Sequence, residues 1–307
     1  MKRVAVLTGG VGGAKLVLGL AELGLSDGVT AIVNTGDDFT HLGLHVCPDL
    51  DTLLYTLAGK ANAAQGWGRE GETWTFMEAL QSLDGESWFQ LGDGDLALHV
   101  IRSWRLARGD SLSAIQADFA RAWAVGMRLL PMSDAPVRTW LQTDEGALEF
   151  QRYFVQRRCT PRVAAIDYRG AAAAVPAAGV SDAILDAEAV LIAPSNPYLS
   201  IGPLLAVPAI AAAVRETEAP VVLVSPLIRG EAVKGPTAKI MRELGLQPGN
   251  AAVADFYRGL LQGMVVDQAD DGPAGLALAQ TATLMKTAQD RQRVARAALD
   301  LAQTLRS

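Results

Sequence analysis

The chain has 307 residues, of which 50% are hydrophobic and 20% are charged, and its net charge at pH 7 is -6. This composition is typical of a soluble globular protein that can bury a sizeable core. An extended nucleic-acid surface is not expected, because it would need clustered Lys and Arg to neutralise phosphates. A membrane partner is not expected either, since no stretch approaches the roughly 18 apolar residues of a transmembrane helix.

The only two cysteines, Cys47 and Cys159, are far apart in the sequence. They form neither a disulfide framework nor a zinc-type cluster, which fits a reducing compartment. The first apolar run is short and meets glycines at once, so it is typical of a strand rather than a signal peptide. We therefore expect a cytoplasmic location.

Short apolar runs alternate with helical patterns along the chain. The first three elements predicted are a strand, a helix and a strand, at residues 3–8, 12–23 and 30–34. Further strands are predicted at 189–193, 220–225 and 263–267. Runs that are apolar throughout indicate a sheet covered on both faces. We therefore predict an α/β fold with a Rossmann-like, mostly parallel sheet.

Two segments interrupt this alternation. Residues from about 49 to 123 have helical spacing and predict an inserted helical layer. Residues from about 137 to 157 alternate between apolar and polar types and predict a β-hairpin that turns at Asp144, Glu145 and Gly146. Residues 288–305 predict an amphipathic helix. We expect residues 1–307 to form a single α/β domain that carries both insertions.

The first predicted strand ends in a run of glycines, Gly9, Gly10, Gly12 and Gly13. Glycines let the backbone approach an anion while the next helix points its N-terminal amides at it. Phosphate binding is therefore favoured over a tight turn that merely requires small residues. The run is neither a P-loop nor the dinucleotide fingerprint, whose last glycine would fall on Lys15.

The second predicted strand is followed by four carboxylates, Asp37, Asp38, Asp49 and Asp51. Open α/β sheets bind ligands at the carboxyl ends of their strands, so this loop should lie beside the glycines. Carboxylates near phosphates suggest magnesium, with Asp37 and Asp51 as the ligands. The alternative is a turn at the Asp pair and a helix cap at Asp49, which explains part of Asp49.

A second anion contact is favoured after the strand at 189–193, where Ser195 and Asn196 precede another helix start. Ser and Asn are also ordinary turn formers, which is the alternative. Ser225 and the run Lys234–Thr237 repeat this pattern after the next strand.

Several polar residues are weaker candidates. His41 and His45 lie in the acidic loop without an identifiable partner, and His99 is interpreted as an ordinary helix residue. Cys47 lacks an activating base and is interpreted as packing. The segment from Gln90 to Asp95 fits either a loop with an N-cap or a substrate contact.

Taken together, motifs along nearly the whole chain resemble the 2-phospho-L-lactate transferases, the CofD family of coenzyme F-420 biosynthesis. The motifs are GGVGGAKL from Gly9, NTGDD from Asn34, CPDLDTLLYTLAG from Cys47, GWG from Gly66, LGDGDLALHVIR from Leu91, LLPMSD from Leu129 and APSNPYLSIGP from Ala193. In combination they are highly specific.

The resemblance implies a Rossmann-like core, a magnesium requirement and usually a homodimer. It implies transfer of a phospholactyl, phosphoenolpyruvyl or phosphoglyceryl group from a guanosine diphosphate-linked hydroxy-acid donor to the ribityl hydroxyl of the deazaflavin Fo, with release of GMP. Asp51 and Gln90 then become deazaflavin contacts, and Asp93 is taken as a substrate contact beside them. The loop from Gly9 to Gly13 and the pair Ser195 and Asn196 take the nucleotide phosphates.

Phosphoryl transfer needs chiefly positioning and charge neutralisation, which glycine amides and magnesium can supply. We expect Asp37 and Asp51 to hold magnesium across the diphosphate, and Asp38 to orient or deprotonate the attacking hydroxyl. The assignment of base and ligands within this set of aspartates stays open at this point.

Two other functions compete with the transferase. One is a nucleotide-sugar-binding regulatory protein of the related gluconeogenesis-factor family, which also begins with a glycine-rich loop. That family has a serine- and glycine-rich run after its Asp pair, whereas this chain continues DDFTHLGLHVCPDLDT, which favours the transferase. The other is a dinucleotide oxidoreductase, which is disfavoured because Asn34 stands where such enzymes commonly place an acid.

Overall fold

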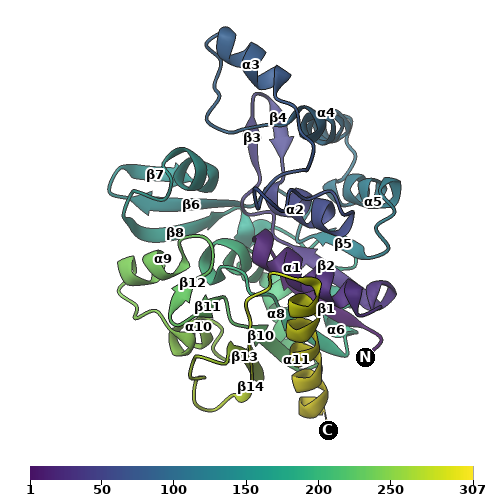
Figure 1. The fold of residues 1–307 in the computed structure, drawn as a ribbon, viewed down its shortest axis with the longest axis vertical. Coiled ribbons are helices and arrows are strands. Elements are labelled where there is room, and N and C mark those ends of the chain that lie inside the picture. Colours follow the sequence, from purple (N-terminus) through teal and green to yellow (C-terminus); the bar gives the residue numbers. More distant parts are fainter. Residues whose placement is uncertain (307) are drawn as a thin grey trace.

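The computed structural model describes residues 1–306 (Figure 1). Within these residues the largest sheet has seven strands, all parallel, in the order β14-β13-β10-β9-β1-β2-β5. The strands are β1 (Val4–Thr8), β2 (Val29–Val33), β5 (Arg128–Pro131), β9 (Ala189–Ile192), β10 (Val221–Val224), β13 (Gly263–Asp267) and β14 (Ala277–Thr281). The predicted α/β fold with a Rossmann-like parallel sheet is confirmed.

Helices cover both faces of this sheet, which explains why its central strands are apolar throughout. Successive side chains of a strand point to opposite faces. In β1, Ala5 and Leu7 belong to one hydrophobic core and Val4 and Val6 to the other. The first core lies under α6 (Val180–Leu185), α7 (Gly202–Leu205), α8 (Pro208–Glu216), α9 (Thr237–Glu243) and α10 (Asn250–Phe256). The second lies under α1 (Gly10–Glu22), α2 (Pro48–Leu57), α5 (Leu112–Ala122) and α11 (Ala288–Arg306).

The order in which the chain adds strands to the sheet reverses between β1 and β9. The chain runs from β1 through β2 to β5, then returns to pair β9 with the other side of β1 and continues to β10, β13 and β14. Loops that follow β1 and β9 therefore diverge to opposite sides. In open parallel sheets this divergence leaves a crevice at the carboxyl ends of the strands, where ligands bind.

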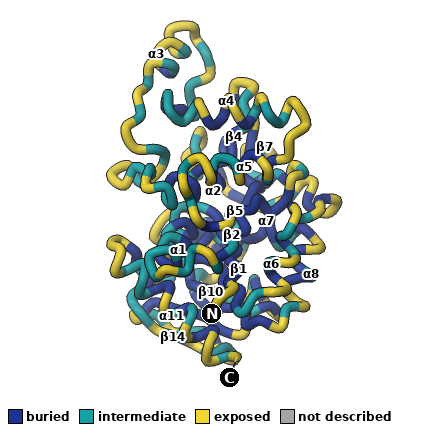
Figure 2. The backbone as a smooth tube through the Cα atoms, turned by 90° about the vertical axis from the view of Figure 1, so that its right-hand side faces the viewer, coloured by how far each residue is buried: buried dark blue, intermediate teal, exposed yellow. Residues whose placement is uncertain are grey.

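Four helices occupy the segment 49–123 that was predicted to be helical. Of these, α2 contacts α1, and α5 contacts β5. By contrast, α3 (Thr75–Ser82) and α4 (Asp93–Ala107) lie above the sheet together with a short hairpin, β3 (Phe39–His41) and β4 (Leu44–Val46) (Figure 1). Buried residues are concentrated in the strands of the sheet, whereas the α3 region is largely intermediate or exposed (Figure 2).

The second interruption contains the predicted hairpin, β6 (Arg138–Thr143) and β7 (Gly146–Glu149). Thr143 pairs with Gly146, so the turn lies at the expected residues. After β7 the chain forms a π-helical turn at Arg152–Gln156 instead of a strand, and β8 (Val163–Arg169) adds a third strand on the other edge of β6.

The remaining elements are short. They are the two-stranded pair β11 (Leu227–Ile228) and β12 (Glu231–Ala232), the 3-10 helices Ser26–Gly28 and Ala171–Ala173, and the π-helical turn Pro197–Ile201. Among the described residues no single helix is both long and apolar enough to cross a membrane. Only the bent pair Pro197–Leu205 and Pro208–Glu216, which meet at 87°, reaches that length and composition together.

Candidate active site

A cavity of about 700 Å³ opens at the carboxyl ends of the strands. Its walls come from the loops after β1, β2, β9, β10 and β14, and from α2 and α4. This volume lies within the range of small-molecule and cofactor sites. The cavity is therefore the crevice that the reversal of strand order predicts.

The glycine run brings α2 into contact with the start of α1. Gly10 donates its backbone N–H to Asp49 Oδ1 at 2.6 Å. A Cβ on Gly9 would overlap Asp49 Oδ2, and a Cβ on Gly12 would lie 2.6 Å from the Pro194 carbonyl oxygen. Gly9, Gly10 and Gly12 line the cavity. The absence of side chains at these positions therefore lets two neighbouring loops approach the first turn of α1.

Gly13 has a different role from the other three glycines. A Cβ on Gly13 would overlap the hydroxyl of Thr8 and lie 2.8 Å from Ser195 Oγ. It is buried and does not belong to the cavity wall. Gly13 is thus a packing position beneath the loop, whereas Ser195 and Asn196, like the other glycines, line the cavity.

Asp37 and Asp49 are held by the same side chain. Asn34 Nδ2 lies 3.0 Å from Asp49 Oδ2 and 3.4 Å from Asp37 Oδ1. Among the described residues, the only other side chain that donates a hydrogen bond to the Asp37 carboxylate is Gln151, whose Nε2 lies 3.4 Å away. Both carboxyl groups are buried and both line the cavity. The loop after β2 and the first turn of α2 therefore place two weakly neutralised acids beside the glycine loop.

The electrostatics of this pair reflect their burial. Burial raises the pKa of Asp49 to about 6. Burial also raises the pKa of Asp37, and the negative charges of Asp49 and Asp38 raise it further. Like charges in a poorly solvated place disfavour ionisation. A divalent cation between these carboxylates would relieve that repulsion, and carboxylate oxygen is a preferred magnesium ligand.

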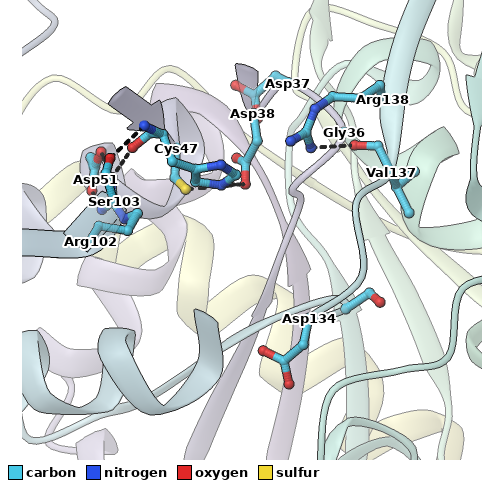
Figure 3. Close-up of polar contacts among 12 residues, drawn as sticks. Gly36, Asp37, Asp38, Cys47, Asp51, Arg102, Ser103, Asp134, Val137 and Arg138 are labelled. Carbon is cyan, nitrogen blue, oxygen red and sulfur yellow. Dashed lines mark hydrogen bonds and ion pairs between the residues drawn. The ribbon is translucent and has the colours of Figure 1, made fainter. Parts of the chain in front are cut away.

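Asp38 contacts two residues in and directly after β4. Its Oδ2 accepts a hydrogen bond from Cys47 Sγ at 3.1 Å and lies 3.4 Å from His45 Nε2 (Figure 3). Asp38 is not among the residues that line the cavity. Cys47 is buried, and its burial raises the pKa of the thiol. The geometry therefore lets Asp38 fix the β3–β4 hairpin against α2, and it does not place Asp38 in the cavity wall.

Asp51 forms a buried ion pair. Arg102 NH1 donates to Asp51 Oδ2 at 3.1 Å, and NH2 donates to Oδ1 (Figure 3). His99 extends the contact, since its Nδ1 lies 3.7 Å from Asp51 Oδ2 and its Nε2 lies 3.3 Å from Asp95 Oδ2. The Tyr55 hydroxyl also donates a hydrogen bond to Asp95 Oδ1. Asp51, Asp95, His99 and Tyr55 all line the cavity.

Sequence reasoning missed this network. His99 was interpreted as an ordinary helix residue, Asp95 only as part of a segment that fits a loop with an N-cap or a substrate contact, and Arg102 was given no role. The three residues stand at i, i+4 and i+7 of α4, which places them on one face of the helix. That spacing of an acid, a His and a buried Arg was the available signal.

Gln90 and Asp93 take different places, although they belong to one motif. Gln90 lines the cavity, and its Nε2 donates to the Ser87 carbonyl at 2.8 Å. Asp93 does not line it. Its carboxylate accepts backbone N–H groups of Thr75 and Phe76 at 3.1 and 3.0 Å, at the start of α3. In this geometry Asp93 supports α3 from the start of α4, as the alternative interpretation of the segment allowed.

The rest of the cavity wall contributes two further kinds of side chain. Rings of Tyr55, Trp67, Phe89, Phe150 and Phe154 supply apolar, flat surface. Two cations, Lys15 and Lys234, also line the cavity. The cavity thus combines carboxylates, amide groups at a helix start, aromatic rings and ammonium groups, which suits a ligand with both phosphates and an aromatic ring system.

Comparison with known proteins identifies relatives along nearly the whole chain. The family model described as "2-phospho-L-lactate transferase CofD" matches residues 4–304. A "Phosphoenolpyruvate transferase" of Streptomyces griseus is 42% identical over 317 residues, which covers 99% of this chain and 100% of that protein. A "2-phospho-L-lactate transferase" of Methanopyrus kandleri is 40% identical over 309 residues, which covers 99% and 98%.

A solved structure shows the same fold. A member of the UPF0052 family from Bacillus halodurans superposes with a TM-score of 0.65 over 97% of this chain and 100% of that chain, at 18% sequence identity.

Proposed function

The chain belongs to the 2-phospho-L-lactate transferase CofD family, and from this we propose that it moves a three-carbon phospho-acid from a guanosine diphosphate-linked donor to the ribityl hydroxyl of the deazaflavin Fo, with release of GMP. That the chain is a transferase of this family follows from the match over residues 4–304. The donor, acceptor and leaving group are the proposal.

One geometric observation carries it. The buried carboxylates of Asp37 and Asp49 share the Asn34 amide, and Asp49 also accepts the first amide of α1. Phosphoryl transfer requires cationic neutralisation next to phosphate oxygens. Here weakly neutralised acids lie directly beside a helix start that can bind phosphate.

The donor set fits magnesium. Asp37 and Asp49 are the ligands that we propose first, because both carboxyl groups line the cavity, share the Asn34 amide and lie beside the start of α1. Asp51 was expected to be a ligand, but both its oxygens already accept from Arg102. We therefore assign Asp51 to the cavity wall, where its side chain faces either the metal or the acceptor. When bound, magnesium would neutralise the diphosphate and polarise the transferred phosphorus.

The protein itself supplies orientation. Gly9, Gly10 and Gly12 let the phosphates reach the start of α1, and Ser195 and Asn196 close the other side of that loop. The Asn196 Nδ2 is buried without a hydrogen-bond partner among the described residues, so it has donors free for a phosphate oxygen. Aromatic rings and Gln90 face the same cavity and suit the tricyclic ring of the acceptor.

The proton of the attacking hydroxyl needs an acceptor in the cavity. Asp38 was expected to take it; in this structure Asp38 contacts Cys47 and His45 and does not line the cavity. Of the two acids after β2, Asp37 is the one that lines the cavity, so it can accept the proton there through the carboxylate oxygen that does not contact the metal.

The test is a direct assay. The purified chain is incubated with Fo, magnesium and each of three donors that carry phospholactate, phosphoenolpyruvate or phosphoglycerate. Release of GMP together with a deazaflavin product of the matching mass supports the proposal, and the product mass identifies the acid. Asp37→Asn should abolish turnover with the fold intact, whereas the exposed Asp27→Asn should not. Absence of GMP with every donor would refute the proposal.

A further inference from the structure

We propose that Lys15 and Lys234 form a clamp for the phosphate group that leaves with the nucleotide. This inference rests on the proposed function and assigns a binding and catalytic role to two residues that stand outside the carboxylate cluster. The ligand class is a diphosphate ester, and the group held is the phosphate nearer to the nucleoside.

Lys15 reaches the cavity from α1. It lies two residues after the last glycine of the run, and its side chain is half-buried. Its Nζ donates to the carbonyl oxygen of Met285 at 2.8 Å, in the segment after β14. The ammonium group therefore lies between the glycine loop and the far half of the sheet.

Lys234 reaches the same cavity from the opposite direction. It follows β12, in the loop that leads to α9, and its Nζ donates to the carbonyl oxygen of Gly66 at 3.2 Å. Gly66 and its neighbours Trp67 and Gly68 also line the cavity. The contact thus joins two loops, 168 residues apart in sequence, across the rim.

Neither ammonium group has a carboxylate partner within 4.0 Å in the part of the chain that the structure describes, although both line a cavity that contains four aspartates. Each donates only to a backbone carbonyl. The two positively charged groups also repel each other. Burial lowers the pKa of Lys15, and the positive charges of Lys234 and Arg291 lower it further. An anion between Lys15 and Lys234 would remove this repulsion.

Charge is therefore divided across the cavity. The aspartates belong to the loop after β2 and to α2 and α4, on the side of the sheet that runs from β1 to β5. Lys234 belongs to the segment between β12 and α9, which follows β10, and Lys15 of α1 donates to Met285 in the segment after β14. A diphosphate that spans the glycine loop would have one phosphate at the acidic end, where a cation is needed, and one at the lysine end.

This division matches the charge changes of the reaction. The acceptor oxygen forms a bond to the phosphorus of the transferred group, and the bond from that phosphorus to the bridging oxygen breaks. The electron pair stays on the bridging oxygen, which leaves as part of GMP, and the hydroxyl proton passes to a carboxylate at the acidic end. Negative charge thus grows on the nucleotide phosphate, where preorganised cations lower the barrier.

The experiment has a binding arm and a turnover arm. Inorganic pyrophosphate and GDP are titrated into wild type, Lys15→Gln, Lys234→Gln and the double variant by calorimetry at two salt concentrations. We expect about tenfold weaker binding for each substitution and a smaller salt dependence, because each ammonium group contributes a charge-assisted contact. Lys2→Gln, at the opposite end of β1, is the matched control and should bind as wild type does.

In the turnover arm, Lys15→Gln should lower kcat by about 100-fold, the magnitude seen when one preorganised donor to a developing charge is removed. Lys15→Arg should restore part of kcat, because it keeps the charge. Thermal unfolding confirms that each variant folds. Unchanged pyrophosphate binding and kcat in a folded double variant would overturn the clamp. If wild type transfers nothing but binds pyrophosphate through the lysines, the clamp stands and the proposed function fails.

Discussion

At the scale of single residues, the buried ion pair between Asp51 and Arg102 is the contact in the site that is most sensitive to the loss of one partner. Arg102 is fully buried and Asp51 nearly so, and the guanidinium donates to both carboxylate oxygens. A buried ion pair is weak evidence for stability in itself, but removal of one partner leaves an uncompensated charge. This contact also orients Asp51 at the cavity wall.

We predict that Arg102→Met lowers the free energy of unfolding by about 3 kcal/mol, because Asp51 then keeps a buried charge without a partner. Urea denaturation measures the change. Arg105→Met, three residues further along α4, is the matched control: Arg105 pairs with the exposed Asp110 and Asp118, so its removal should cost far less. Equal losses in the two variants would contradict the prediction.

Gly9 gives a second test at this scale. Its backbone is extended, with φ of -168°, so alanine is allowed there by conformation. Its Cβ would nevertheless overlap Asp49 Oδ2. The Cβ would also lie 2.9 Å from the Cβ of Ser200, so the loop that carries Ser200 must shift too. We predict that Gly9→Ala displaces the Asp49 carboxylate and weakens magnesium binding and turnover.

Calorimetric titration with magnesium and the GMP-release assay check this. Gly126→Ala is the control, because the nearest atom to its Cβ, in Ser26, lies 4.0 Å away. If Gly9→Ala binds magnesium as Gly126→Ala does, Asp49 is not a ligand.

At the residue level, the sequence predicted proximity where the signal was local. The glycine run and the aspartates after β2 follow one another in the chain, and the ends of neighbouring parallel strands fix where they meet. The sequence did not predict the partners of Asp38 or the burial of Arg102, because both depend on how the β3–β4 hairpin and α4 fold back onto α2. Asp49 was interpreted in part as the cap of its own helix. In the structure it instead accepts a hydrogen bond from the first backbone N–H of α1.

At the scale of elements, α11 begins with a reciprocal cap. Thr287 donates its backbone N–H to Asp290 Oδ2 at 2.9 Å, and Asp290 donates its N–H to Thr287 Oγ1 at 3.2 Å. Such a capping box satisfies helix-start amides that lack partners. The hydrogen bonds from Thr287 hold the pKa of Asp290 well below its usual range. Because α11 packs along α1 and the sheet, this start helps to anchor the second core.

We predict that Asp290→Ala lowers stability at neutral pH, and that the difference from wild type is pH-dependent. A carboxyl group whose pKa is lower in the folded state contributes stability above its unfolded pKa and loses it as pH falls through the folded pKa. The difference should therefore be constant from pH 8 to 5 and shrink below about pH 4. Urea midpoints across this range measure it; a difference that grows toward acid would be inconsistent with the cap.

Four of the strands that the sequence missed lack the pattern by which a strand is recognised. The strand β8 has only one fully buried residue, and β14 alternates between intermediate and exposed positions at the sheet edge. Neither forms the continuous apolar run that identified β1, β9, β10 and β13. The hairpin β3–β4 has strands of three residues, too short for periodicity to detect.

At the scale of the whole molecule, the cavity joins the two halves of the sheet. Its acidic residues follow strands and helices on the β1–β2–β5 side, and Ser225, Lys234 and Met285 follow strands on the β10–β13–β14 side. Strand order itself cannot be read from apolar runs, but the rule that open sheets bind ligands at the carboxyl ends of their strands predicted a site at the first strand end, where the cavity lies. A ligand that spans the glycine loop would therefore contact both halves.

We predict that magnesium and GDP stabilise the protein together far more than either does alone. Without a cation, phosphates that enter the cavity meet the carboxylates of Asp37 and Asp49; without phosphates, magnesium lacks part of its ligand set. Each ligand should therefore strengthen binding of the other, as reciprocal coupling requires. With both ligands present at 100 times their dissociation constants, each bound ligand adds about 2.7 kcal/mol to the unfolding free energy.

Thermal unfolding with neither, one or both ligands measures this coupling. The shift with both should exceed the sum of the separate shifts, and Asp37→Asn should reduce the excess because one of the two repelling carboxylates is gone. Calcium in place of magnesium should retain part of the excess, since it also accepts oxygen ligands but with looser geometry. Strictly additive shifts in wild type would mean that metal and nucleotide bind in separate places, and that the two strand ends do not form one site.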